Sequence, residues 1–405
     1  MIKRLRDSID RQMSWFERNG PTSLDQYDFW ASRYGQFSKA TYYKNRLIGG
    51  ALVCPIFLLE LLYPETRRFV APRRRFPIAD AHVILGHLNM HAVTGKISYL
   101  EMAETVGAAL LQSSIRGYHG HCWGYPFDWM TTRGLWRAGT PLITTTPYCF
   151  EAFVGLHQVT GRKEYADVAR SILRFAVEDL NVTKVGDGGL ASSYSPMDHS
   201  KVMNASAYRA FVLVEGHRLF GDEVALRLGE QLLKFLLQSQ QQDGSWLYGL
   251  DHPNDAFVDN FHTCFVLKNL YKCNRLLERQ DLGDAIKSGH SFYARNLVRD
   301  GEVPKPFQKV GRVNLVAEEM YDYAEGISLG YLLERDVPGA GGIASRMLGR
   351  LLQRYQTEDG YFLTRVMRGG FSNKVPYLRW PQSQLYFALT NGLRFGTSDE
   401  SVCVE

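Results

Sequence analysis

The chain has 405 residues, of which 45% are hydrophobic and 22% are charged, and its net charge is +5. This composition is typical of a globular protein with a large core. The mild positive charge suits an acidic small ligand or polymer, and it is far from the basic surface that nucleic-acid binding needs, so a nucleic-acid partner is excluded.

The first twenty residues, "MIKRLRDSIDRQMSWFERNG", carry basic side chains but no apolar core of the kind found in a secretory leader. The cysteines are scattered and form no CxxC pair. Reduced thiols and a cytoplasmic location are therefore expected. The six cysteines are Cys54, Cys122, Cys149, Cys264, Cys273 and Cys403.

The stretch "LIGGALVCPIFLLELLY" (Leu47 to Tyr63) is strongly apolar and has basic residues on both sides. It contains Pro55 and Glu60 and is shorter than the roughly 20 clean residues that a membrane span needs. The pattern favours a packed helix of the domain. Peripheral contact with an anionic membrane through residues 44–75 is the alternative.

Asp-Gly dipeptides begin at Asp187, Asp243, Asp300 and Asp359, at intervals of 56, 57 and 59 residues, which indicates a repeat architecture. Each unit contains two predicted helices. The first is apolar nearly all round, as in "YCFEAFVGLHQV" (148–159), and is expected to be buried on both sides. The second is amphipathic, as in "EVALRLGEQLLKFLLQS" (223–239), and is expected to lie outside.

Six inner helices are predicted to begin near residues 79, 147, 204, 260, 321 and 381, but only five outer helices follow them. The segment Leu47 to Tyr63 is assigned as the sixth outer helix. The predicted fold is thus all-α: one (α/α)6 toroid of six helical hairpins over residues 1–405, with residues 1–46 as an N-terminal extension.

The connections predict where a site is built. Inner-to-outer turns such as "TGKI" and "FGDE" are short, whereas the connections 116–144, 181–203, 241–258, 299–318 and 357–380 are long. Long loops on one rim of a rigid scaffold commonly carry function. Every inner helix also points its N-terminus at that rim, and convergent positive dipole ends attract an anion.

Aromatic and polar clusters fall on this rim, in "YHGHCWGYPFDW" (118–129), "SSYSPMD" (192–198), "DGSWLYG" (243–249), "DNFH" (259–262), "EEMYDYAEG" (318–326) and "NKVPYLRW" (373–380). Aromatic faces stack on pyranose rings while polar groups bond the hydroxyls, so a sugar cleft is predicted. Aromatic side chains that merely plug the barrel mouth are the alternative.

Two of these clusters allow a second interpretation of their function. His119, His121 and Cys122 in "HGHC" are potential metal ligands, but their spacing matches no known zinc module, so no metal is predicted. In "DNFH", Asp259 is expected to cap a helix whatever else it does. His262 in the first helical turn is either a proton acceptor in a cleft or a satisfied core histidine.

The segment "DNFHTCFVLKNL" (259–270) resembles part of the protein prenyltransferase β-subunits, whose histidine there is a zinc ligand. Together with "QQDGSW" (241–246), the resemblance implies a toroid of the squalene-cyclase and prenyltransferase type. The Asp and Cys ligands of that family are absent from "NASAYRAF" (204–211), and the Asp-rich acid motif of the cyclases is missing. Zinc and isoprenoid chemistry therefore do not carry over.

Four motifs, "CWGYPFDW" (122–129), "GTP" (139–141), "SYSP" (193–196) and "DNFHT" (259–263), resemble a toroid family encoded beside bacterial polysaccharide-assembly enzymes. The segment "TTPYCFEAFVGLHQVTG" (145–161) is similar to heparosan-type glucuronyl 5-epimerases. That enzyme class uses tyrosines and a carboxylate in an (α/α) barrel cleft, which implies chemistry on uronic acids.

The predicted function is 5-epimerisation of a uronic-acid-containing saccharide, in which a base removes the proton beside the carboxylate and an acid reprotonates the opposite face. The candidates for proton transfer are His262, Tyr248, Tyr194 and Glu325. A tyrosine donor would need a nearby cation to lower its pKa from about 10. The substrate-binding candidates are Asp128, Asp259, Asn260, Trp123, Tyr125, Trp129, Trp246, Tyr321 and Arg379, with Arg379 assigned to the substrate carboxylate.

Three alternatives stay open: a polysaccharide lyase, which begins with the same proton abstraction, a glycoside hydrolase and a non-catalytic sugar-binding protein of a polysaccharide-assembly complex. A hydrolase needs two opposed carboxylates, for which Asp128, Asp259 and Glu325 are candidates. No cofactor is expected. The predicted partner is an acidic saccharide, and a homodimer is an alternative to a monomer.

Overall fold

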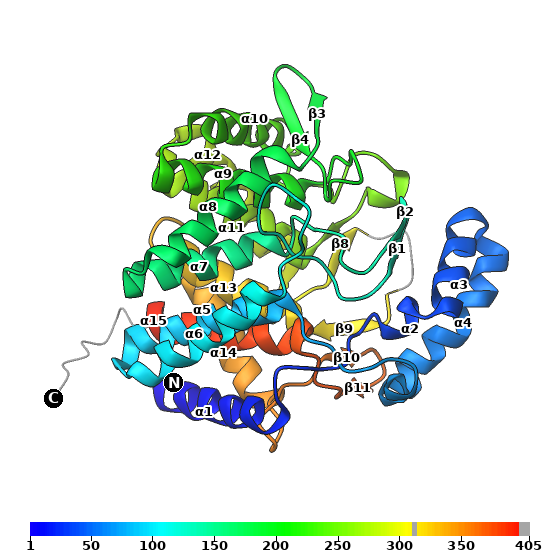
Figure 1. Ribbon diagram of the computed structural model, residues 1–405. Helices are drawn as coiled ribbons and strands as arrows, with labels where there is room; N and C mark the ends of the chain where they lie inside the picture. Colours follow the sequence, from blue (N-terminus) through cyan, green and yellow to red (C-terminus); the bar gives the residue numbers. More distant parts are fainter. Residues whose placement is uncertain (310–313, 397–405) are drawn as a thin grey trace.

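The computed structural model describes residues 1–309 and 314–396, and Cys403 lies outside them. Six helices form the inner ring of the toroid, and each contacts the next around the ring until α15 meets α5 (Figure 1). They are α5 (Pro77–Thr94), α7 (Thr146–Thr160), α9 (Met203–Phe220), α11 (Asn260–Leu277), α13 (Met320–Leu333) and α15 (Ser383–Phe395). The predicted all-α toroid is confirmed.

The outer helices pack against the inner ones and complete the hairpins. They are α6 (Ile97–Gln112), α8 (Lys163–Glu178), α10 (Glu223–Ser239), α12 (Gln280–Phe292), α14 (Ala340–Arg354) and α1 (Ile2–Asn19). The turn after α5 is tight because Gly95 adopts φ 67°, in the left-handed region that glycine tolerates best. Gly161 and Gly221 end α7 and α9 in the same way.

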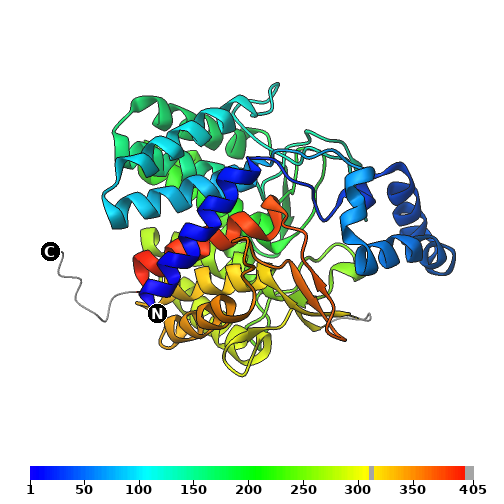
Figure 2. The ribbon, with the colours of Figure 1, turned by 90° about the horizontal axis from the view of Figure 1, so that it is seen from below.

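The assignment of the sixth outer helix to Leu47–Tyr63 is wrong, because α1 fills that place against α15 and α14 (Figure 2). Leu5, Ile9 and Met13 recur every fourth residue and are buried in the core that α15 shares. This spacing puts them on one face of a helix. The first helical turns of the chain therefore belong to the ring.

The segment assigned to the ring instead forms a hairpin that projects from its side, as both ribbon views show. It comprises α2 (Asp28–Ala31), α3 (Arg33–Lys44), α4 (Arg46–Leu62) and the short helix η1 (Pro64–Phe69). α4 packs against α3 and η1, while α2 and α3 contact β1 (Trp129–Thr131). The expected helix is present, but it is not packed into the toroid.

The long connections hold short antiparallel strand pairs that an all-helical reading did not predict. β1 pairs with β2 (Gly134–Trp136), β3 (Val182–Val185) with β4 (Gly189–Ser192), and β6 (Val298–Arg299) with β7 (Val303–Pro304). β5 (Val258–Asp259) pairs with β8 (Phe307–Lys309), and β9 (Val316–Glu319), β10 (Arg365–Met367) and β11 (Ser372–Asn373) form a three-stranded sheet. The other short helices are η2 (Pro253–Asp255), η3 (Tyr293–Leu297) and η4 (Leu378–Gln382).

The predicted difference between the two rims is confirmed. The inner-to-outer connections are short, as between α7 and α8 or between α9 and α10, and the outer-to-inner connections carry the strand pairs. Because inner helices run in the same direction, their N-termini all meet the strand-bearing loops (Figure 1). Loops from six hairpins are thus gathered around one end of the ring.

Candidate active site

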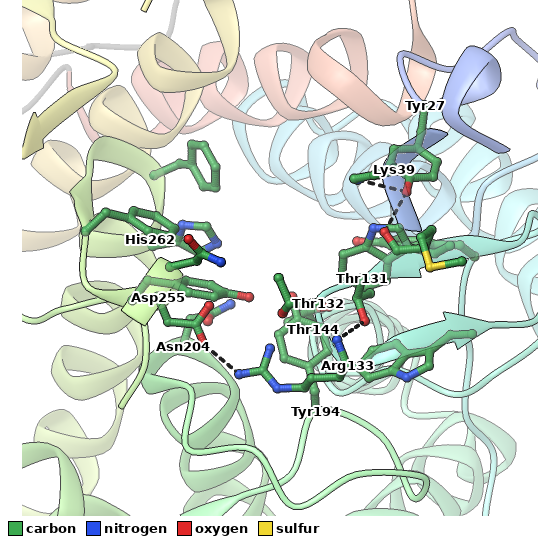
Figure 3. Close-up of a pocket in the computed structure, with 18 of the residues that line it drawn as sticks. Tyr27, Lys39, Thr131, Thr132, Arg133, Thr144, Tyr194, Asn204, Asp255 and His262 are labelled. Atoms are coloured by element: carbon green, nitrogen blue, oxygen red, sulfur yellow. Dashed lines mark hydrogen bonds and ion pairs between the residues drawn. The ribbon is translucent and has the colours of Figure 1, made fainter. Parts of the chain in front are cut away.

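A cavity of about 840 Å³ opens at the rim where the inner helices begin. Its walls come from the first turns of α9, α11 and α13, from the β1–β2 hairpin, from the 253–257 loop and from the α3–α4 hairpin. Figure 3 shows His262 and Asp255 on one side of the space and Tyr27, Lys39 and Thr131 on the other. The volume is within the range of small-molecule sites.

His262 and Asp259 form a pair at the start of α11. Asp259 caps the helix by accepting from the His262 backbone N–H, and both of its carboxylate oxygens lie near His262 Nδ1, at 2.9 and 2.7 Å. The carboxylate is 2% exposed, whereas the imidazole is 19% exposed and lines the cavity. A carboxylate at Nδ1 fixes the tautomer that leaves Nε2 able to accept a proton.

Aromatic rings hold the imidazole in place. Tyr248 and Phe261 lie against it with ring centroids 4.6 and 4.3 Å away, and Phe265 lies at 5.7 Å. All of them line the cavity. His262 therefore lines the cavity, with the buried carboxylate of Asp259 behind it.

Three predicted tyrosines, Tyr194, Tyr248 and Tyr321, also line the cavity. Burial raises the pKa of each phenol above its ordinary value. The condition set for a tyrosine donor, a pKa lowered by a nearby cation, is not met, because Arg133 and Arg379 oppose this rise without outweighing burial. These hydroxyls stay protonated near neutral pH and can donate.

Further aromatic rings make the cavity walls. Trp129 meets Tyr125 and Trp136, with centroids 5.5 and 5.4 Å apart. Tyr321 stacks on Trp380 at 3.9 Å with an interplanar angle of 21°. All five line the cavity. Tyr125, Trp129 and Tyr321, three of the predicted binding residues, thus lie on the cavity wall.

Arg379 lines the cavity, but two N–H groups of its guanidinium are already hydrogen-bonded within the protein. Nε and Nη2 donate to the two oxygens of Asp25 at 2.6 and 2.7 Å, and the Asp25 side chain is fully buried. The guanidinium also lies over the Tyr125 ring, 4.8 Å from its centroid. The bidentate face assigned to a substrate carboxylate is therefore used within the protein.

Three predicted binding residues lie in the core instead. Trp123 and Trp246 are 0% and 3% exposed, and their indole N–H groups donate to the carbonyls of Leu110 and Leu236. Asn260 is also buried, and its amide nitrogen donates to the carbonyls of Leu297 and Lys305. These side chains fix the rim loops to the helices and do not line the cavity.

Two predicted carboxylates are also away from the cavity. Glu325 lies in the second turn of α13, where it is 3% exposed and accepts from Lys268 Nζ at 2.5 Å. Asp128 is partly exposed and accepts from Arg137 and the Ala138 backbone N–H. Neither residue lines the cavity that His262 and Arg379 line, so the structure does not bring these two candidates together with them.

The "HGHC" residues bond to different partners. His119 pairs with Asp179 at 2.8 Å on the exposed surface, His121 Nδ1 contacts the hydroxyl of Ser114, and Cys122 is buried near the carbonyl of Ile115. No group of three or more His, Cys, Asp or Glu side chains that could hold a metal ion occurs within residues 1–309 and 314–396.

Sequence reasoning missed several cavity residues. Arg133 from the β1–β2 turn donates to Asp255 at 2.7 Å, and Lys39 from α3 donates to the hydroxyl of Tyr27 at 3.0 Å (Figure 3). Asn204 and Thr144 are buried at the wall beside the Tyr194 hydroxyl, and both act to lower the pKa of that phenol against the larger effect of burial.

The sequence could have indicated Asn204 as a site residue, because it is a polar residue at the rim end of an otherwise apolar helix. No sequence pattern indicates Lys39 or Arg133, since only the folded chain brings the α3–α4 hairpin and the β1–β2 turn together. Among the described residues that line the cavity, Asp255 is the only carboxylate, beside Lys39, Arg46, Arg133 and Arg379. The wall is predominantly cationic.

The sequence matches no family model and no curated protein. Its fold is similar to that of an unsaturated glucuronyl hydrolase specific for heparin, with a TM-score of 0.64 at 10% identity, covering 96% of this chain and 97% of that one. A sugar epimerase from a ruminal bacterium gives 0.59 at 12% identity, covering 80% and 88%. A polysaccharide lyase gives 0.56 at 12%, covering 80% and 91%. At these identities the likeness shows the fold, an all-α (α/α) toroid.

Proposed function

We propose that this protein is an enzyme that acts on a uronic-acid-containing saccharide, and that it epimerises the carbon beside the carboxylate. The observation that carries the proposal is the cavity wall itself. Within the described part of the chain, it combines stacked aromatic rings with four cationic side chains and a single carboxylate, Asp255. Aromatic faces suit sugar rings, and the excess of cations suits an acidic sugar.

His262 is the proposed base. Its Nδ1 faces Asp259, so Nε2 is the nitrogen that can take a proton, and the ring borders the open space in Figure 3. Asp259 stabilises the imidazolium that forms, as a buried carboxylate does behind other catalytic histidines. His262 is the only histidine among the described residues that line the cavity.

Tyr248 and Tyr194 are the proposed acids. Burial raises the pKa of both phenols, so each carries its proton near neutral pH. A carbanion is a stronger base than a phenolate, so it can take this proton although no cation lowers the pKa. After the reaction His262 releases the proton that it took to water, and the tyrosinate takes a proton back from water, so the reaction consumes no net proton.

Arg133 is proposed to bind the substrate carboxylate in place of Arg379, because the guanidinium of Arg379 already donates to both carboxylate oxygens of Asp25. The Arg133 side chain is 23% exposed, and it donates through Nη2 to Asp255 at 2.7 Å and to Asp251 at 3.5 Å, which leaves Nε and Nη1. Arginine donates through five N–H groups, so further donors remain for the substrate carboxylate. Charge on the enediolate that follows proton abstraction would be stabilised by the same guanidinium.

The lyase is the second candidate, because it shares the base and the carboxylate-binding group and differs only in expelling the neighbouring sugar oxygen. A hydrolase that uses two opposed carboxylates receives less support. Asp255 alone among the described lining residues is a carboxylate, and Asp128, Asp259 and Glu325 are not on the wall.

The test is incubation of the protein with a panel of uronate-containing oligosaccharides and neutral oligosaccharides in deuterated water, followed by NMR. We expect deuterium at the carbon beside the carboxylate of an acidic member. Exchange with an inverted product indicates the epimerase, and an unsaturated uronate detected by its ultraviolet absorbance indicates the lyase.

His262→Gln and Tyr248→Phe should each lower the exchange rate by at least about a hundredfold, as removal of a general acid or base commonly does. His157→Gln at the far end of α7 and Tyr165→Phe on outer helix α8 are matched controls that should change it little. New reducing ends without exchange, or turnover of neutral oligosaccharides alone, would overturn the proposal.

A further inference from the structure

The outer face of α4 is apolar and exposed to solvent. Along this face lie Leu47, Ala51, Cys54, Leu58 and Leu62, all of them exposed, which are called here the apolar stripe. Leu47 is 87% exposed, and Leu58 and Leu62 are each 50% exposed. Their spacing of three and four residues places them on one side of the helix. A surface helix of a globular protein normally turns such a face inward.

The buried side of the same helix is small. Gly49 and Ile56 are its buried residues, and they face the α3 side of the hairpin. More apolar surface borders the stripe, because Ile48, Phe57 and Phe69 are 59%, 52% and 75% exposed. A contiguous exposed apolar surface of this kind marks an interaction site.

Positive charge is concentrated in the same segment. Residues 28–75 contain nine Lys and Arg and three Asp and Glu, a net charge of +6, whereas the whole chain carries +5. The rest of the molecule is therefore close to neutral. Lys44 and Arg46 are exposed immediately before the stripe, and beyond α4 exposed Arg68 lies over the Phe69 ring, 4.8 Å from its centroid.

This combination suits a lipid surface. An interfacial helix buries its apolar face at the level of the acyl chains, while adjacent Lys and Arg side chains attract anionic headgroups. A protein partner would need no such charge excess, since the cores of protein interfaces are depleted of charged residues. No helix in the described part of the chain has the length and apolarity to cross a bilayer.

The hairpin that carries the stripe also forms one wall of the cavity. Lys39, Tyr42 and Tyr43 of α3 and Arg46 of α4 line it, and Arg46 donates to the side chain of Asn254 on the 253–257 loop. Docking through the stripe would therefore hold the cavity mouth beside the surface on which the protein sits.

We propose that the apolar stripe and its flanking cations dock this protein onto an anionic membrane surface, so that the cavity takes saccharides at that surface. Membrane docking is inferred from the exposed apolar stripe and its flanking charge alone. The saccharide substrate, in contrast, rests on the proposed function.

Cys54 provides a direct probe, because it lies in the middle of the stripe while Cys122, Cys149, Cys264 and Cys273 are buried. A Cys403→Ser variant of the full chain, labelled at Cys54 with an environment-sensitive fluorophore, is mixed with vesicles. We expect a blue shift with vesicles of equimolar phosphatidylglycerol and phosphatidylcholine, and a much weaker shift with phosphatidylcholine alone.

Vesicle flotation of the unlabelled protein gives the second measurement. Leu47→Glu with Leu58→Glu should lower the partition coefficient by at least about tenfold, since two apolar side chains that would be buried among the acyl chains become charged. Val224→Glu, at a position that is 53% exposed on outer helix α10, is the matched control and should leave binding unchanged.

The proposal is overturned if the unaltered protein does not float with anionic vesicles, or if the double variant floats equally well. It is also overturned if the stripe instead joins two copies, which light scattering would show as a dimer dissociated by Leu58→Glu. Deuterium exchange on soluble oligosaccharides separates the two proposals, because the double variant should keep it while losing vesicle binding.

Discussion

Lys268 and Glu325 form a buried ion pair in the middle of the ring, between α11 and α13. Lys268 Nζ donates to Glu325 Oε2 at 2.5 Å, and the side chains are 7% and 3% exposed. Burial acts to lower the pKa of Lys268, but the Glu325 carboxylate outweighs it and raises that pKa, so the lysine is charged. We predict that Glu325 stabilises the ring and transfers no proton.

The perturbation is Glu325→Gln, which leaves the Lys268 ammonium buried without its counter-charge. Breaking a buried pair by removing one partner costs about 3–5 kcal/mol. Replacing both members by apolar residues of similar volume, as in Lys268→Met with Glu325→Leu, is commonly neutral or stabilising by about 1–4 kcal/mol. The single variant should therefore lose several kcal/mol, and the double variant should recover nearly all of it.

The assay is urea unfolding followed by circular dichroism, with the deuterium-exchange rate measured on each folded variant. A stabilising role predicts that the double variant keeps the exchange activity. If Glu325→Gln were as stable as the unaltered protein yet inactive, and the double variant were inactive too, Glu325 would be a catalytic residue and this reasoning would be wrong.

Three further predictions concern acid stability, ring closure and substrate charge. Burial lowers the pKa of His82 to about 3 and that of His87 to about 4, against about 6.5 in the unfolded chain. Stability is then full above about pH 6.5 and falls as the unfolded chain takes up protons at lower pH, by about 2 kcal/mol per histidine at pH 5. His82→Phe should remove its share of that loss in urea titrations at pH 7 and 5, and an undiminished loss would contradict the assignment. Ile9 is fully buried in α1, so Ile9→Ala should lower the free energy of unfolding by about 2–5 kcal/mol. Leu62→Ala on the exposed side of α4 should change it by less than about 0.5 kcal/mol. Equal losses would contradict the role of α1 in closing the ring. Arg133→Gln should raise KM for an acidic oligosaccharide by about tenfold or more and weaken the salt dependence of KM. Lys184→Gln, at an exposed position of β3, is the control. An unchanged KM in Arg133→Gln would show that Arg133 does not bind the substrate.

Local features of the chain could be predicted because they depend on near neighbours in sequence. Apolar residues all round "YCFEAFVGLHQV" (148–159) require a helix buried on both sides, and α7 is such a helix. The same holds for the Asp259 cap, which acts within the first turn of α11, and thereby for the place of His262 at the rim.

Which way a rim side chain points was decided by tertiary structure. Trp123 and Trp246 lie in aromatic-rich segments like that of Trp129, which lines the cavity. Their indole N–H groups nevertheless donate to backbone carbonyls near helix ends, and packing buries them. Arg379 finds its carboxylate partner 354 residues earlier in the chain, at Asp25. No local pattern contains such a pairing.

The sequence by itself determined the series of hairpins, the rim that carries the site, and the histidine with its capping carboxylate, since periodicity and capping act over a few residues. Tertiary structure decided which helix closes the ring, because α1 and α4 both offer apolar residues and only packing against α15 distinguishes them. It also placed Lys39, Arg133 and Asp255 around one cavity, where residues distant in the chain meet only after the toroid has closed.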